Sequence, residues 1–121
     1  MNHFYMNGIL WHIRLVPHNS PLLVDRTGNA RVATTDPISR CIYISYGLDE
    51  SYFDRVLIHE LGHCALFSFD LIRDIHQMVR REFWIEAEEW ICNFISDYGM
   101  MIFFIAGEIT TIPRKIELLV S

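Results

Sequence analysis

The chain has 121 residues, enough for one domain that buries about two-thirds of the surface its unfolded form would expose. Hydrophobic residues make up 51% and charged residues 21% of the sequence, which excludes a disordered tail. The formal net charge of -5 and the scattered Lys and Arg residues argue against a nucleic-acid-binding surface, because phosphate contacts need clustered cations. Residues 1–121 are therefore treated as a single domain.

Cysteine usage and apolar runs predict the compartment. Cys41, Cys64 and Cys92 are an odd number at wide spacing, so a disulfide framework is not expected. The N-terminus has no basic region followed by an apolar core and a cleavage site, so no secretory signal is predicted. Residues 100–106 form a run of seven apolar residues, far short of a membrane span. We expect a reducing, cytoplasmic setting without a membrane.

The first third of the chain predicts a sheet. Residues 9–16 alternate between apolar and polar, which is typical of a half-buried strand. Further short strands are predicted over residues 22–24, 30–34 and 40–45, with turn-forming sequences between them. Strands at this spacing, joined by short loops, predict a small antiparallel sheet of three to four strands.

A buried helix is predicted next, over about residues 50–69, with Asp49 or Ser51 as its N-cap. Its apolar residues lie nearly all round the helix, so it should be buried.

This helix carries His59-Glu60-Leu61-Gly62-His63, which has the spacing H-E-x-x-H. Residues four apart lie above one another on a helix, so both imidazoles can bind one metal ion. Glu60 lies about 100° further round the helix, within reach of a water on that metal. The pattern predicts a hydrolytic zinc site with His59 and His63 as ligands and Glu60 as the general base.

Two helical segments follow. Residues 70–83 are expected to form a mobile or helical connection over the site, and residues 84–98 an amphipathic helix. Gly99 is expected to kink or end this helix, and residues 100–105 continue the apolar pattern. The tail, residues 107–121, is expected to pack through Ile116, Leu118 and Leu119. The predicted fold class is therefore α+β.

A catalytic zinc site normally has a third protein ligand, and the second helix supplies the candidates. Glu88 falls near the middle of the apolar face of this helix, whereas Glu86 and Glu89 lie on its polar side. A carboxylate on an apolar face needs a partner. We therefore predict Glu88 as the third ligand, with a structural ion pair as the alternative.

With these motifs the chain resembles the gluzincin-type metallopeptidases of the ImmA/IrrE kind, which are common in phages and mobile elements. The resemblance covers roughly residues 40–98. That family combines a small sheet, an H-E-x-x-H helix and a helix with E-x-x-A-N-x-F-A, whose first Glu is the third ligand. Glu88 and Phe94 match this second pattern, and Ile91 and Cys92 depart from it. Cys92 stands where the family has the residue that orients a ligand through a hydrogen bond.

The resemblance leaves Glu89 open as the alternative ligand, because that choice places Asn93 at the expected E-x-x-x-N spacing. It implies a zinc-dependent endopeptidase of minimal zincin-like fold that acts on a protein substrate, such as a phage or mobile-element regulator. The residues alone predict metal-assisted hydrolysis, with His76 and Tyr98 as candidate donors to the oxyanion. The competing hypothesis is a non-catalytic, zinc-stabilised module that binds a host or phage protein.

Overall fold

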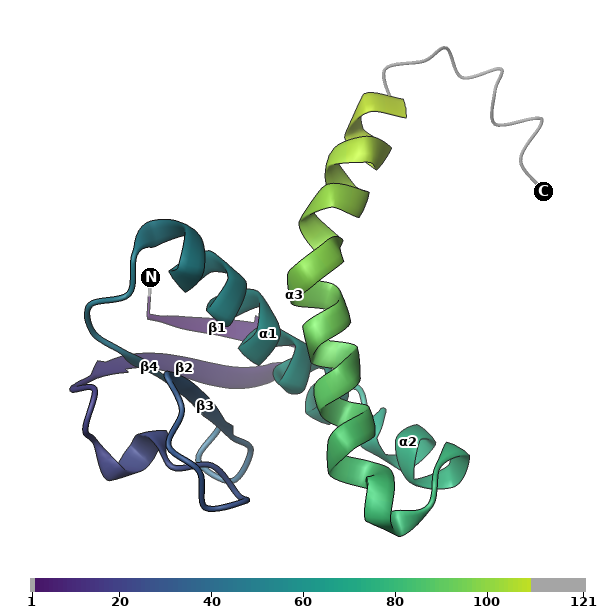
Figure 1. The fold of residues 1–121 in the computed structure, drawn as a ribbon. Coiled ribbons are helices and arrows are strands. Elements are labelled where there is room, and N and C mark those ends of the chain that lie inside the picture. The colour runs from purple at the N-terminus through teal and green to yellow at the C-terminus, as the bar shows by residue number, and fades with distance from the viewer. Residues whose placement is uncertain (1, 110–121) are drawn as a thin grey trace, which may run out of the picture.

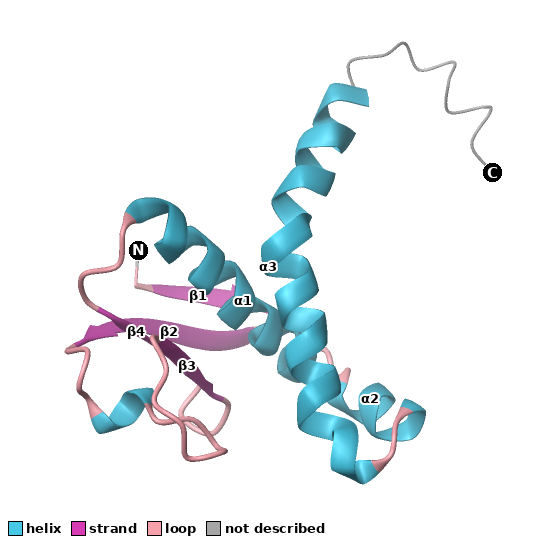
Figure 2. Cartoon of the chain, in the orientation of Figure 1, coloured by secondary structure: helices cyan, strands magenta, loops and turns pink. Residues whose placement is uncertain are grey.

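Four strands form one sheet in the computed structural model, which describes residues 2–109 of the chain (Figures 1 and 2). The strand order across the sheet is β1-β2-β4-β3, and three α-helices follow within the described residues, so the expected α+β class is confirmed. The elements in chain order, with 3-10 helices written η, are β1 His3–Met6, β2 Ile9–Val16, η1 Pro21–Leu23, β3 Ala33–Asp36, β4 Cys41–Ser45, α1 Glu50–Ser68, α2 Ile72–Met78, η2 Arg81–Phe83 and α3 Trp84–Ile109.

The sheet is mixed, so the expectation of a wholly antiparallel sheet is wrong. β1 pairs antiparallel with β2, and β3 antiparallel with β4, but β2 and β4 run parallel. All five residues of β4 are buried, as in a strand covered on both faces, and β4 accordingly takes an inner position. The chain therefore passes from β2 through residues 17–32 to the edge strand β3 before it returns to the centre as β4.

The start of the chain holds a strand that its sequence did not predict. β1 joins β2 through a two-residue turn at Asn7 and Gly8, whose φ angles are 51° and 75°. Positive φ at both positions suits the twist of a tight hairpin. The predicted strands over residues 9–16 and 40–45 are confirmed to within one residue.

Two further strand predictions need correction. Residues 22–24 were expected to form a strand, but Pro21–Leu23 is a 3-10 helix because the Ser20 hydroxyl accepts a hydrogen bond from the Leu22 amide and Pro21 occupies the first helical turn. The strand expected over residues 30–34 begins only at Ala33 and extends to Asp36.

The core lies between the sheet and α1. The Asp49 carboxylate, one of the two predicted N-caps, caps α1 by accepting a hydrogen bond from the Tyr52 amide at 2.9 Å. At the other end of the helix, Trp11 Nε1 donates a hydrogen bond to Ser68 Oγ at 2.8 Å and so fixes α1 to β2. The buried residues of this cluster are Trp11, Ala33, Ile42, Ile44, Val56 and Cys64.

α3 is one continuous helix of 26 residues, so Gly99 does not end it. Its first half packs on α1 and α2, and its second half projects beyond the rest of the domain (Figure 1). By length and composition alone, the helical stretch Arg81–Ile109 is long and apolar enough to cross a membrane. The connection over residues 70–83 is helical in α2 and η2, whereas the tail contacts predicted for Ile116, Leu118 and Leu119 lie outside the described residues.

Candidate metal centre

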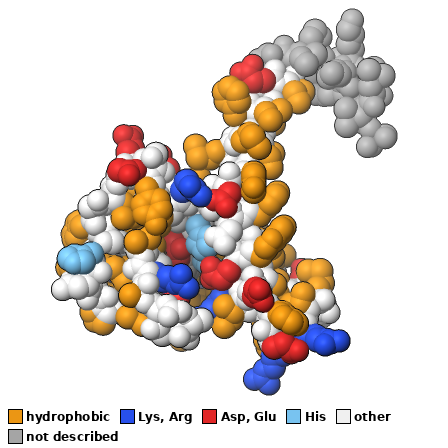
Figure 3. All heavy atoms as spheres, viewed as in Figure 1, with side chains coloured by type: hydrophobic (Ala, Val, Ile, Leu, Met, Phe, Trp, Pro, Cys, Tyr) orange, Lys and Arg blue, Asp and Glu red, His pale blue; other side chains and the backbone are white. Residues whose placement is uncertain are grey.

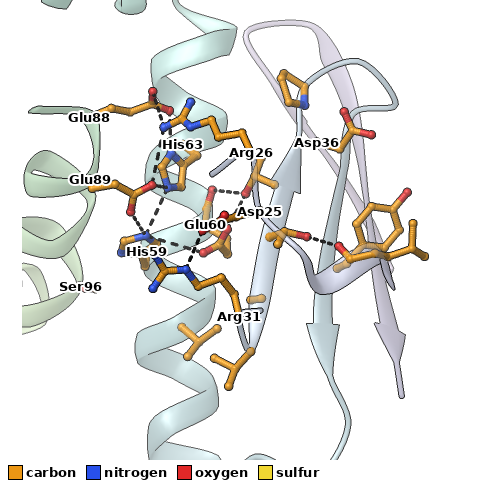
Figure 4. A pocket seen from close by; sticks show the side chains of 18 of the residues that line it. Asp25, Arg26, Arg31, Asp36, His59, Glu60, His63, Glu88, Glu89 and Ser96 are labelled. Atoms are coloured by element: carbon orange, nitrogen blue, oxygen red, sulfur yellow. Dashed lines mark hydrogen bonds and ion pairs between the residues drawn. The ribbon is translucent and has the colours of Figure 1, made fainter. Parts of the chain in front are cut away.

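Three residues of α1 face a cleft of about 850 Å³ between α1, α3, β3 and the loop of residues 25–31. His59, Glu60 and His63 offer ligand atoms that all lie within 4.8 Å of one another, so the group can hold a metal ion. The helical spacing of four residues brings His59 Nε2 to 3.2 Å from His63 Nε2. Figure 4 shows both imidazoles on one side of α1, directed toward the carboxylates of α3.

Glu89 lies across both imidazoles. Its Oε2 atom is 3.1 Å from His59 Nε2, and its Oε1 atom is 3.2 Å from His63 Nε2 (Figure 4). These are the same two nitrogens that lie 3.2 Å apart on α1. The side chain is 42% exposed, so this carboxylate stands at the opening of the cleft and not in the core.

Glu88 is buried and contacts the opposite side of the His63 ring. Its Oε1 atom lies 2.8 Å from His63 Nδ1, and its Oε2 atom lies 2.9 Å from the Arg26 guanidinium. The Nδ1 nitrogen points away from His59, and an N–H at Nδ1 leaves Nε2 with a free lone pair. Glu88 therefore contacts the nitrogen through which a hydrogen bond can fix the orientation of the His63 ring.

Glu60 is the buried carboxylate of the motif. Thr35 on β3 donates a hydrogen bond to Glu60 Oε1 at 2.9 Å, and Glu60 Oε2 lies 3.8 Å from His59 Nε2. Burial raises the pKa of this carboxyl group above its ordinary value. β3 thus holds Glu60 beside the two imidazoles through a single side-chain contact.

The local field favours a positive charge between these carboxylates. Burial opposes protonation of His63, but contacts with Cys92, Glu88 and Glu89 outweigh burial and raise its pKa to about 12. Hydrogen bonds from His59 and His63 lower the pKa of Glu89 in turn. The neighbouring carboxylates therefore favour a positive charge at His63.

A close contact between Gly62 of α1 and Cys92 of α3 sets the distance between these two helices. A Cβ atom added at Gly62 would lie 3.1 Å from Cys92 Sγ and 3.5 Å from the Cys92 Cα atom. Gly62 and Cys92 are both buried. The glycine within the motif therefore allows the backbone of α3 to approach α1 closely enough for Glu88 and Glu89 to reach the imidazoles.

The loop of residues 25–31 forms the wall opposite α3. Asp25 organises it by accepting hydrogen bonds from the Thr27 amide and hydroxyl and from the Asn29 amide, and by pairing with Arg31 at 2.7 Å. The hydrogen bonds from Thr27 and Arg31 lower the pKa of Asp25. The turn so formed directs Arg26 across the cleft to Glu88 (Figure 4).

The two predicted oxyanion donors lie elsewhere. His76 stacks on Trp84 with ring centroids 3.7 Å apart, and Tyr98 contacts Phe94 on the exposed side of α3. Neither lines the cleft, whereas Arg26 and Arg31 do. Both arginines precede the motif by about 30 residues in the sequence, and no local pattern signals them.

Comparison with protein-family models and with curated proteins finds no match for this chain. The function has to be argued from the residues of the cleft.

Proposed function

We propose that the chain is a zinc-dependent metallopeptidase, with His59, His63 and Glu89 as the metal ligands and Glu60 as the general base. The observation that carries the proposal is the position of Glu89 across both Nε2 nitrogens. Two imidazole nitrogens and one carboxylate are the ligand set of many catalytic zinc sites, which leave one position open. Glu60 is left for the base, because it lies further from the imidazoles than Glu89 does and is held by Thr35.

The distances between the donor atoms support zinc. In a tetrahedron with metal–ligand distances of about 2.0–2.1 Å, neighbouring ligand atoms lie about 3.3 Å apart. His59 Nε2 and His63 Nε2 lie 3.2 Å apart, close to this separation. One Glu89 oxygen lies near each nitrogen, Oε2 at 3.1 Å from His59 and Oε1 at 3.2 Å from His63.

Glu88 takes a different role in this proposal from the one its sequence predicts. A hydrogen bond from His63 Nδ1 to Glu88 would fix the ring orientation and leave Nε2 for the metal, as carboxylates beside metal-binding histidines commonly do. Arg26 holds Glu88 in turn at 2.9 Å. In this proposal the ligand is therefore Glu89, one residue after the Glu88 that matches the ligand position of the family pattern.

Bound zinc would supply Lewis-acid chemistry, which lowers the pKa of water and polarises a carbonyl group. Glu60 accepts a proton from the attacking water and passes it to the leaving amine. Its buried position, with a raised pKa, suits a base that must be protonated and deprotonated in each turnover. In keeping with the resemblance to ImmA/IrrE-type enzymes, the proposed substrate is a protein, such as a phage or mobile-element regulator.

Matched variants of the adjacent glutamates test the ligand assignment. Zinc affinity is measured by competition with a chromogenic chelator for Glu89→Gln, Glu88→Gln and the control Glu86→Gln, whose side chain is exposed on the same helix. Glu89→Gln should weaken zinc binding by about 100-fold or more, since loss of a ligand exceeds loss of an orienting contact. Glu88→Gln keeps an acceptor for His63 and should lose about tenfold or less. Glu86→Gln should bind as the wild type does.

A larger loss of zinc affinity in Glu88→Gln than in Glu89→Gln would show that Glu88 is the ligand. Wild-type protein that binds no zinc would remove the metallopeptidase proposal. Zinc binding without cleavage of any member of a proteome-derived peptide library, read by mass spectrometry, would favour the non-catalytic binding module.

A further inference from the structure

The second half of α3 has no covering layer within the described residues. The buried residues of α3 are Glu88, Cys92, Ser96 and Gly99, and none follows Gly99. Beyond this point the helix projects from the domain, and apolar side chains cover it (Figures 1 and 3). The exposed fractions are 57% for Met100, 54% for Met101, 47% for Ile102, 75% for Phe103, 69% for Phe104 and 49% for Ile105.

This surface is apolar on every side of the helix. Residues 100–106 are seven consecutive apolar residues, and successive residues on a helix are rotated by about 100°. They therefore point in all directions around the axis. A partner helix or a protein groove covers one stripe, whereas a helix that is apolar all round matches surroundings that are apolar all round. Lipid acyl chains provide such surroundings.

The uncharged part of α3 has the length of one leaflet. Asp97 pairs with Arg55 of α1 and Ser96 is buried, so α3 belongs to the aqueous domain up to Asp97. From Tyr98 to Gly107 the helix carries no charged residue, and these ten residues rise about 15 Å. The hydrocarbon core of a bilayer is about 30 Å thick. The stretch is therefore too short to cross a bilayer and can enter one leaflet only.

The even distribution of apolar residues distinguishes lipid from a second copy of the chain. Residues 98–107 carry no charge, and a helix from a second copy would cover only one side of this segment. After the segment the sequence carries Glu108, Arg114, Lys115 and Glu117, so it has no excess of either charge there.

We propose that the end of α3, from Tyr98 to Gly107, inserts into one leaflet of a lipid membrane and anchors the domain there, with the cleft in water. The proposal is independent of the metal centre. It replaces the expectation of a chain without a membrane, which treated residues 100–106 as a separate run and not as the end of a 26-residue helix.

Flotation of the full chain with lipid vesicles tests the anchor. The vesicles contain phosphatidylcholine with about one-quarter phosphatidylglycerol, and phosphatidylcholine alone serves as the comparison. The double variant Phe103→Glu/Phe104→Glu charges the projecting segment, and Ile38→Glu is the matched control because Ile38 is 93% exposed in the β3–β4 turn. Wild type and Ile38→Glu should float with both vesicle types, and the double variant should lose at least about tenfold in the bound fraction.

Three results would overturn the proposal. The first is wild-type protein that stays with the aqueous fraction for both vesicle types. The second is equal flotation of the double variant and the wild type, which would place the lipid contact elsewhere. The third is a discrete oligomer in light scattering that the double substitution dissociates, without any flotation, which would show that a second copy covers α3.

Discussion

The two halves of α3 depart from the usual division between core and surface in opposite ways. The half from Trp84 to Asp97 buries a carboxylate, since Glu88 is 5% exposed, whereas the half after Gly99 leaves Phe103 75% exposed. Buried charges and large exposed apolar surfaces both cost free energy unless a partner is present. In the first half, Glu88 has partners within the protein, His63 and Arg26, whereas the proposed partner of the second half is lipid outside the domain. The two halves of one helix thus present contrasting chemistry.

The largest effect is expected at the proposed metal centre, which lies between α1 and the first half of α3. His63→Ala removes a proposed ligand and also leaves Glu88 without the ring that contacts it, so zinc affinity should fall by more than about 100-fold. Zinc should then no longer raise the melting temperature, which calorimetry with and without a chelator measures. An unchanged zinc-dependent shift in His63→Ala would place the metal elsewhere.

Glu60→Gln should separate zinc binding from catalysis at the same centre. The amide keeps the contact with Thr35 but cannot take a proton, so peptide hydrolysis should fall by at least about 100-fold while zinc affinity stays at the wild-type level. Titration of zinc and the initial rate on a cleaved peptide are measured on the same preparation. Equal rates for the variant and the wild type would exclude Glu60 as the base.

Gly62→Ala tests the contact that sets the distance between α1 and α3. The new Cβ atom would lie 3.1 Å from Cys92 Sγ, so overpacking should lower the free energy of unfolding by about 1–3 kcal/mol and weaken zinc binding. Adding Cys92→Ala removes the clashing sulfur and should restore much of both losses. A gain in stability of about 1 kcal/mol from Gly62→Ala alone, as helix propensity favours, would show that the helices separate without cost.

The smallest effect on stability is expected in the projecting half. Phe103→Ser/Phe104→Ser removes two large apolar side chains that lie in water in the isolated domain. The free energy of unfolding from urea denaturation should therefore stay within about 0.5 kcal/mol of wild type, and zinc affinity should not change. A loss of several kcal/mol would mean that the segment packs against the rest of the chain, and the contrast between the two halves would disappear.

Local spacing in the sequence was sufficient to predict several parts of the molecule. The alternation in residues 9–16, the cap at Asp49 and the helix that places His59 and His63 together depend on neighbours within a few residues, so sequence reasoning found them. The α+β class follows from the same local patterns. β1 and the 3-10 helix at Pro21–Leu23 were missed because turn residues, and not hydrophobic periodicity, decide them.

Tertiary structure decided what depends on contacts between distant segments. The order of strands follows from the burial of β4 on both faces, which adjacency in sequence cannot reveal. Glu88 and Glu89 are neighbours about 100° apart on α3, and their roles depend on how α3 crosses α1 at Gly62 and Cys92. That crossing places Glu89 at the two Nε2 nitrogens and Glu88 at Nδ1 of His63. The His63 ring thus contacts both glutamates, and not only the residue at the centre of the apolar face of α3.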